Sequence, residues 1–241
     1  LTEDSPATGK TSYSYDADGN LATLTRTNGS VTNYIYDALN RRTKAQTGEQ
    51  VQVWHYDNCT NGIGRLCATS DGITGKGYGY TKSGQLTAQV TKIDGTEYNY
   101  YWLYDAYDRL IQEGVGLNDW KTIYEYDGLN RISTVKFKIG DDIKTVVSDI
   151  RYEPYGGVKS WNYGNGLSRQ ISYDQDYRLT GILASGIQNL SHSYNANNWI
   201  TQINNGLDSN KTTKYTYDAL GRLNIASSNQ YKESWHNDTT Y

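Results

Sequence analysis

Tyr34-Ile35-Tyr36-Asp37-Ala38-Leu39-Asn40-Arg41 is the stretch of sequence that decides the fold of this chain. Its first four residues exemplify a Tyr-x-Tyr-Asp motif that recurs, with variations, along a 241-residue sequence containing 24 tyrosines. Successive copies are separated by roughly 20 to 26 residues, and a repeat of this length predicts one domain of similar units, each packed on its neighbours. Ten copies align on the second aromatic position, at Tyr15, Tyr36, Tyr56, Tyr80, Tyr104, Tyr126, Tyr152, Tyr173, Tyr194 and Tyr217.

The Asp position of each motif predicts the start of a tight turn, called the motif turn below. Three residues later, eight of the nine copies without an insertion have Gly, Asn or Asp, the residues that tolerate positive φ. Tyr177 is the exception and predicts a strained or altered turn. A carboxylate that recurs at one turn position predicts a structural role, accepting backbone N–H groups, rather than catalysis. These structural aspartates are Asp16, Asp37, Asp57, Asp105, Asp127, Asp174 and Asp218, with Thr81, Glu153 and Asn195 in the other copies.

The residues around the motif turn predict two strands per repeat. In Tyr-x-Tyr both aromatic side chains lie on one strand face, and the variable residue between them faces solvent. We expect the tyrosines to form aromatic ladders across adjacent strands. A second turn signal, here called the linker turn, separates successive motifs, as at Asn28-Gly29 and Asp94-Gly95. About twenty antiparallel strands follow.

Residues after the motif turn continue the pattern. A polar residue, often Arg as at Arg41 and Arg109, precedes an aliphatic residue that begins the return strand. We expect this Arg to pair with the Asp of a neighbouring repeat or to stack on a tyrosine ring.

Two cysteines, Cys59 and Cys67, flank an enlarged third motif turn. A local disulfide is favoured over two free thiols, and it fits an exported protein. A metal site would need His55 and a fourth ligand at spacings that match no common zinc pattern, so we expect neither a metal nor a cofactor.

Composition excludes several classes of protein. The net charge of −3 comes without a cluster of Lys and Arg, which argues against a nucleic-acid partner. Apolar runs are too short for a membrane span. The chain starts at Leu1 and contains no Met, which predicts a processed or excised piece. The three histidines occur singly, with no nucleophile or phosphate-loop motif to join them, so we predict no catalytic residue and no enzyme activity.

An all-β, antiparallel fold follows from the hairpin repeats. Twenty strands would make a flat sheet about 95 Å wide, and open sheets beyond about ten strands curl or split. We therefore expect a curved, spiralling sheet that encloses space, with a flat solenoid of stacked hairpins as the alternative.

Copies such as Tyr34 to Arg41 and Tyr215 to Leu223 resemble the RHS, or YD, repeat. The family includes bacterial polymorphic toxins, the C-component of insecticidal toxin complexes and teneurins. The resemblance implies a spiralling sheet wound into a hollow shell, which in the bacterial members encloses a toxin segment. The chain has no Asp-Pro, as found in the family's autoproteolytic core segment, and ten repeats resemble a section of a shell.

The resemblance implies a non-catalytic role as shell wall in a secreted or cell-surface bacterial protein. Its partners would be the rest of its own RHS chain and an enclosed toxin or effector segment. The expected organisation is a lead-in at residues 1–12, ten repeats at 13–225 and the start of a truncated further repeat at 226–241.

The alternative function is a binding module for carbohydrate or cell-surface glycans. Among the tryptophans, Trp120 and Trp161 fall near loops and are the better candidates for stacking on a sugar. Trp54 and Trp102 occupy the first aromatic position of the motif, where ladder packing is favoured.

Overall fold

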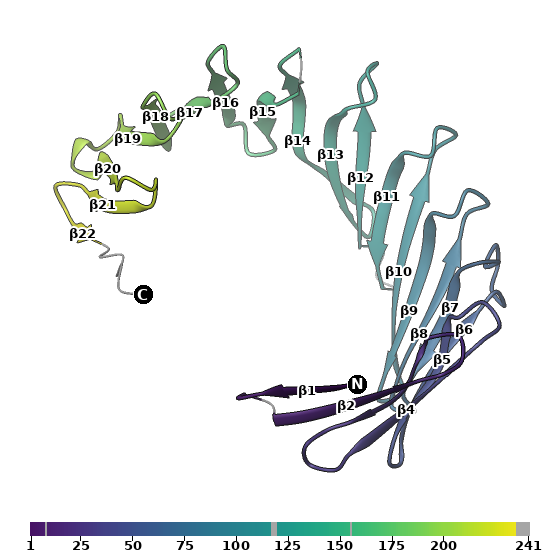
Figure 1. Cartoon of the computed structure of the whole chain (residues 1–241). Coiled ribbons are helices and arrows are strands. Elements are labelled where there is room, and N and C mark those ends of the chain that lie inside the picture. Colours follow the sequence, from purple (N-terminus) through teal and green to yellow (C-terminus); the bar gives the residue numbers. More distant parts are fainter. Residues whose placement is uncertain (8, 117–119, 155, 235–241) are drawn as a thin grey trace. The chain divides into compact units, whose positions relative to one another are not determined.

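The computed structural model describes residues 1–7, 9–116, 120–154 and 156–234. These residues form 22 β-strands and one short 3-10 helix, η1 (Ser209–Lys211). From β1 to β12 and again from β14 to β22, each strand pairs antiparallel with the strand that follows it in sequence. The predicted all-β antiparallel fold is confirmed (Figure 1).

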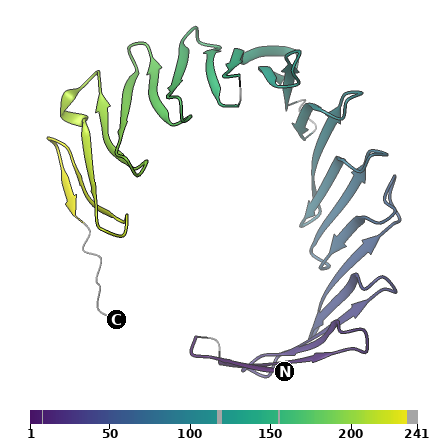
Figure 2. The ribbon, with the colours of Figure 1, turned by 45° about the horizontal axis from the view of Figure 1, so that its top comes forward.

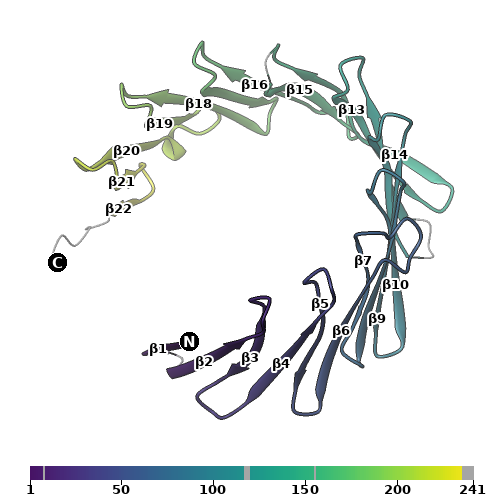
Figure 3. The same ribbon diagram turned by 45° about the vertical axis from the view of Figure 1, so that its right-hand side comes forward.

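The chain divides into two compact units, Leu1–Ile123 with Lys138–Asp141 and Tyr124–Phe137 with Asp142–Tyr241. Strands β12 (Trp120–Tyr126) and β13 (Ile132–Ile139) contribute residues to both units. The other strands of the first unit are β1 (Thr2–Ser5), β2 (Gly9–Tyr15), β3 (Leu21–Thr25), β4 (Val31–Tyr36), β5 (Arg42–Thr47), β6 (Gln50–Tyr56), β7 (Leu66–Ser70), β8 (Thr74–Tyr80), β9 (Leu86–Ile93), β10 (Thr96–Tyr104) and β11 (Leu110–Val115) (Figure 3). Those of the second unit are β14 (Asp142–Tyr152), β15 (Val158–Tyr163), β16 (Ser168–Tyr173), β17 (Leu179–Ala184), β18 (Gln188–Tyr194), β19 (Ile200–Asn205), β20 (Thr213–Tyr217), β21 (Leu223–Ser227) and β22 (Lys232–Ser234) (Figure 2).

Every motif turn has a left-handed residue three positions after the Asp position. The φ angle there ranges from 59° at Asn40 to 148° at Gly156, with Gly64 taking the place in the enlarged third turn. Tyr177 has φ of 60° and its N–H still donates to the Asp174 carbonyl at 3.0 Å. The predicted turn position is confirmed, and the turn at Tyr177 is strained in φ but not rearranged.

In the second motif turn, the Asn40 N–H donates to the Asp37 carbonyl at 3.0 Å and the Asp37 N–H to the Arg41 carbonyl at 2.9 Å. With Asn40 left-handed, this is a type I turn closed by a G1 bulge, one of the common three-residue hairpin loops. The register then slips again, because Tyr36 pairs with Arg42 while Ile35 pairs with Lys44. This second bulge leaves no residue directly opposite Thr43 in the register, although the Thr43 hydroxyl donates to the Ile35 carbonyl at 3.2 Å, and it increases the twist.

Where both flanking strands and their pairing are described, the linker turns are hairpins as predicted, with one exception. The turn predicted at Gly114 to Gly116 continues into residues 117–119, which lie outside the described residues. Asp94 and Gly95, with φ of 47° and 80°, make a two-residue turn between β9 and β10. The prediction for Asn205-Gly206 is wrong, because β19 and β20 are joined by a longer loop that contains η1. There the Asn205 side chain accepts the Leu207 and Asp208 N–H groups at 3.0 and 3.1 Å, which starts a wider turn.

The sheet has very little buried core. Among the described residues, the buried hydrophobic side chains are Cys67, Ala184 and Ala226, and the buried polar ones are Thr32, Thr91 and Thr213. The residue between the two aromatic positions is exposed in nine copies, for example Ile35 at 53%, and half-buried at Gly79. Stability must therefore come mainly from hydrogen bonds and from packing between neighbouring side chains on each face.

The predicted aromatic ladder across adjacent strands is wrong. The first aromatic residue of a motif pairs across the hairpin with a non-aromatic residue, as Tyr34 does with Ala45 and Trp54 with Thr69. Strands bearing successive motifs are separated by a return strand, so they lie about 9.6 Å apart, two strand spacings. At that distance the tyrosines of successive motifs do not stack directly on one another.

Candidate functional site

The repeated constellation of this chain is the motif turn together with the tyrosine of the next motif. In the turn at Asp37, one carboxylate oxygen accepts the backbone N–H groups of Leu39 and Arg41, both at 2.9 Å. The other oxygen accepts Nε of Arg41 at 2.7 Å. The same pair of backbone bonds recurs at Asp16, Asp105, Asp127, Asp174 and Asp218.

Hydrogen bonding stabilises the charged form of these carboxylates. The backbone N–H of Arg41 lowers the pKa of Asp37 below its ordinary value, and the Arg109 side chain does the same for the pKa of Asp105. The pKa is also lowered at Asp16, Asp57, Asp127, Asp174 and Asp218. Because these carboxylates accept hydrogen bonds that favour the charged form, they are poorly suited to proton transfer.

Of the copies without Asp, Asn195 keeps both backbone bonds and Thr81 keeps one of them. Asn195 accepts the N–H groups of Asn197 and Trp199 at 2.9 and 3.0 Å, and the Thr81 hydroxyl accepts that of Gln85 at 3.0 Å. Glu153 instead pairs with Lys159 at 3.1 Å. The acceptor oxygen is thus the feature shared by the Asp, Asn and Thr copies.

The second tyrosine of a motif closes the preceding motif turn. The Tyr36 hydroxyl donates to the Leu21 carbonyl at 3.0 Å, and Leu21 is the first residue of the strand that follows the previous turn. We call this contact the tyrosine clamp. Equivalent clamps at 2.6 to 3.2 Å join Tyr56 to Arg42, Tyr80 to Leu66, Tyr104 to Leu86, Tyr152 to Ile132, Tyr173 to Val158, Tyr194 to Leu179 and Tyr217 to Ile200.

Side chains after the motif turn also join neighbouring repeats. The Arg41 guanidinium donates to both Asp57 carboxylate oxygens, at 3.0 and 2.6 Å, and lies 4.5 Å from the Tyr56 ring centroid. Asn20 donates to Asn40 at 2.9 Å in the same direction along the chain. Tyrosine clamps therefore tie neighbouring repeats together, and polar contacts at the turns also join the first three repeats.

Cys59 and Cys67 form a disulfide across the enlarged third turn. Gly62 lies directly against it, since a Cβ added there would be 2.4 and 2.5 Å from the two sulfur atoms. The Asn61 side chain donates to the Tyr80 carbonyl at 2.8 Å, which connects the loop to the next motif.

The two tryptophans predicted to contact carbohydrate differ in their surroundings. Trp120, at the start of β12, is 51% exposed. Trp161 in β15 is half-buried, with the Tyr163 ring edge-on at 5.8 Å and the Arg169 guanidinium 5.4 Å from its ring centroid. Trp120 presents the more accessible ring.

The histidines do not assemble a catalytic cluster in the described part of the chain. His55 is on β6 and His192 on β18, where burial lowers the pKa of His192, while His236 lies outside the described residues. Within the described ranges, no group of three or more His, Cys, Asp or Glu side chains is placed to hold a metal ion. No helix in those ranges is long and apolar enough to cross a membrane.

Part of this repeat sequence matches a known family of repeats. The profile of the family described as RHS Repeat matches residues 15–52, which include the first two motif turns. No curated protein matches the sequence.

Solved structures share the fold at low sequence identity. The crystal structure of TcdB2-TccC3 matches with a TM-score of 0.81 and 17% identity, over 95% of this chain and 14% of that chain. TcdB2-TccC3-Cdc42 matches with a TM-score of 0.79 and 17% identity, over 95% of this chain and 13% of that one. A Tc holotoxin pore from Photorhabdus luminescens matches with a TM-score of 0.78 and 17% identity, also over 95% and 13%.

This chain therefore spans about one seventh of the length of the chains that it matches. The resemblance to the RHS/YD-repeat family, predicted from the tyrosine motif, is confirmed: the chain contains RHS repeat sequence and shares the fold of these Tc toxin chains.

Proposed function

We propose that this chain is wall material of an RHS-type shell that encloses a toxin or effector segment. The observation that carries the proposal is the repeated tyrosine clamp, because it ties each repeat only to its neighbour. Such a wall can be extended repeat by repeat without a thick core. The sparse burial fits a wall whose two faces both remain accessible.

The proposed partners are the remaining RHS sequence of the same protein and the segment that it encloses. A secreted or surface-exposed bacterial location is supported by the disulfide, which persists in oxidising compartments. The role is structural rather than catalytic, because the recurrent carboxylates are held by their own turns.

Limited proteolysis of the full-length protein that contains these repeats tests enclosure. We expect the segment that follows the shell to resist protease in the intact protein and to be digested after the shell is opened with denaturant. Digestion of that segment in the intact protein at the rate of the isolated segment would contradict the proposal.

Glycan binding is a second candidate, supported by the 51% exposure of Trp120. A glycan array probed with the wild-type chain and with Trp120→Ala tests it. Loss of a specific signal in the variant supports the candidate, and an array without signal rejects it.

A further inference from the structure

The second repeat departs from the pattern of the other nine at the first residue of its return strand. That residue is aliphatic in every other copy, but Arg42 stands there in the second. The nine aliphatic residues are Leu21, Leu66, Leu86, Leu110, Ile132, Val158, Leu179, Ile200 and Leu223. The clamp itself is kept, since the Tyr56 hydroxyl still donates to the Arg42 carbonyl at 3.1 Å. The clamp uses only the backbone carbonyl of Arg42, so its guanidinium is not required for the turn.

A small residue next to Arg42 opens space on the sheet. Ala45 pairs with the first aromatic residue of its motif, Tyr34. Leu24, Ile182 and Ile203 occupy the corresponding position in three other repeats, whereas the last repeat also has an alanine there, Ala226. On the far side of Ala45, the paired residue is Gln52. The long side chains of β4 and β6 thus stand on either side of a short one on β5.

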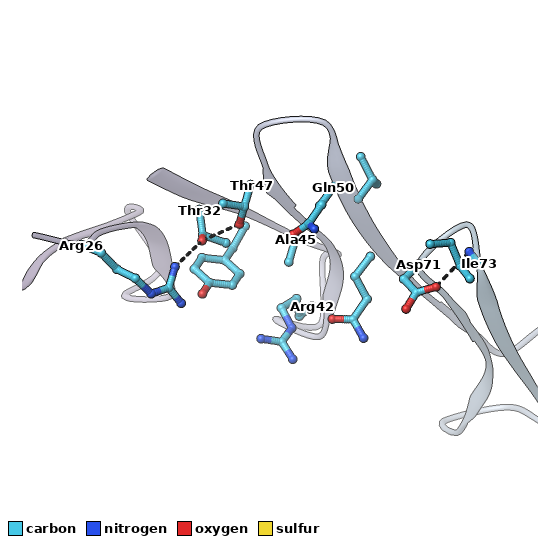
Figure 4. Close-up of a pocket in the computed structure, with 11 residues that line it drawn as sticks. Arg26, Thr32, Arg42, Ala45, Thr47, Gln50, Asp71 and Ile73 are labelled. Atoms are coloured by element: carbon cyan, nitrogen blue, oxygen red, sulfur yellow. Dashed lines mark hydrogen bonds between the residues drawn. The ribbon is translucent and has the colours of Figure 1, made fainter. Parts of the chain in front are cut away.

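Arg42 and Ala45 both line a pocket of about 430 Å³ in the first unit (Figure 4). Ala45 and Thr47 line it from β5, Gln50 and Gln52 from β6, and Arg26 and Arg42 add two positive charges. The Arg26 guanidinium is held by the Thr32 hydroxyl at 3.3 Å, and Thr32 is itself bonded to Thr47 at 2.7 Å.

Two aromatic rings hold the Arg42 guanidinium in place, and no carboxylate among the described residues pairs with it. Its guanidinium lies 4.2 Å from the Trp54 ring centroid and 5.7 Å from that of Tyr34. Among the described residues, neither Arg42 nor Arg26 has a carboxylate partner, although Arg41 next in sequence has two. Stacked guanidinium groups keep their N–H edges free for planar, bidentate acceptors. The pocket is therefore built for a carboxylate.

We propose that this pocket binds an acidic peptide segment, with a Glu or Asp side chain at Arg42 and Arg26. The Gln50 and Gln52 amides can donate to and accept from peptide groups. Asp71 lies at the other end of the pocket, where its carboxylate accepts the N–H groups of Ile73 and Thr74 at 3.0 and 2.6 Å. A peptide suits this polarity, because its side-chain carboxylate and its backbone N–H groups can meet opposite ends.

A saccharide fits less well, since the Arg42 guanidinium covers the aromatic rings of Tyr34 and Trp54 on which a sugar would stack. The proposal is independent of the shell, because binding of a free peptide does not require enclosure.

Fluorescence anisotropy with a labelled, end-blocked peptide of alternating Glu and Ser tests the proposal at low ionic strength. The neutral probe replaces each Glu with Gln. We expect the acidic probe to bind the 241-residue chain about tenfold more tightly than the neutral one, the size of one charge-assisted contact. Arg42→Leu and Ala45→Leu should each weaken the acidic probe about tenfold.

Both variants restore a residue type that other repeats carry at the same position, so the fold should persist, and circular dichroism checks this. Ala45→Leu fills the pocket without changing charge and therefore tests the site even if Arg42→Leu is unstable. Arg151→Leu, at a 68% exposed side chain, is the charge-matched control and should leave binding unchanged.

Equal binding of the two probes, or variants that bind the acidic probe like the wild type, would overturn the proposal. Tighter binding of an oligogalacturonate than of the acidic peptide would overturn the assignment of a peptide and favour an acidic sugar.

Discussion

The motif turns that begin at Asp37 and at Asp57 both reverse the direction of the chain, but different bonds stabilise them. Asp37 bonds to two backbone N–H groups and to Arg41 within a short turn. Asp57 begins a longer turn and accepts one backbone N–H from it, that of Gly64 at 2.6 Å, while its other bonds come from Arg41 of the preceding repeat.

The longer turn is closed by the Cys59–Cys67 disulfide together with this one local carboxylate bond. Both turns are nevertheless followed by the same clamp, from Tyr56 in one case and from Tyr80 in the other. The comparison teaches that the interior of a motif turn can vary, whereas the strand ends and the tyrosine that joins repeats are kept.

Removing the disulfide should have the largest effect and should act only on the longer turn. For a loop of about nine residues, the double variant Cys59→Ser/Cys67→Ser should lose about 2.5 kcal/mol of unfolding free energy. Urea denaturation measures the change. Reductant should destabilise the wild type to the same extent and leave the variant unaffected. Two thiols that alkylate in the native protein without reductant would show that the bridge is absent in solution.

Removing the tyrosine clamp should lower the unfolding free energy by the same amount at the turn of Asp37 and at the turn of Asp57. Tyr56→Phe and Tyr80→Phe each delete one hydroxyl-to-carbonyl bond and should each lower the unfolding free energy by about 1 kcal/mol. Tyr34→Phe is the matched control, because among the described residues its hydroxyl has no hydrogen-bond partner. A control as destabilised as Tyr56→Phe would mean that losing any tyrosine hydroxyl, rather than losing the clamp bond, carries the effect.

Relieving backbone strain in an ordinary turn should have a smaller effect of opposite sign. Tyr177 is 57% exposed and left-handed, and Asn adopts this conformation at lower cost. We expect Tyr177→Asn to raise the unfolding free energy by about 0.5 kcal/mol. Tyr177→Ala is the control, since it removes the ring but keeps the strain. Equal stability of the Asn and Ala variants would argue against strain at this position.

Replacing a turn carboxylate by its amide should have the smallest effect, because the carboxylate's charge contributes at neutral pH and its contribution is lost on acidification. The folded pKa of Asp37 is lowered, so its stabilising contribution is present above the ordinary carboxyl pKa and is lost as pH falls through the folded value. Asp37→Asn keeps the acceptor oxygen, as Asn195 does, but does not titrate. Its stability should fall less than that of the wild type between about pH 5 and pH 2. Parallel pH profiles in urea denaturation would contradict this expectation.

Much of the turn chemistry was predictable because it is local. The left-handed residue and the acceptor at the Asp position act over two to four residues, so residue type alone indicates them. The Asn205-Gly206 signal failed because its side chain also bonds to Leu207 and Asp208, and a local signal does not tell one turn length from another.

The tyrosine partners were not predictable in the same way. The second tyrosine is conspicuous in the motif, but its hydroxyl reaches a carbonyl 14 to 20 residues earlier in the chain. The expected aromatic ladder placed it against the wrong neighbour, since the intervening return strand was not taken into account. The one signal that pointed to the pocket was the break in pattern at Arg42, where nine repeats have an aliphatic residue.

The sequence by itself determined the repeat, the strand-turn-strand unit and the role of the Asp position, because these depend on backbone preferences and hydrogen bonds within a few residues. Only the tertiary structure decided which repeat each tyrosine clamps, how Arg41 bridges two carboxylates and where Arg42 and Ala45 leave an open pocket. Those features depend on strand register and on bulges such as the pair after the motif turn at Asp37, which bring residues 14 or more positions apart into contact.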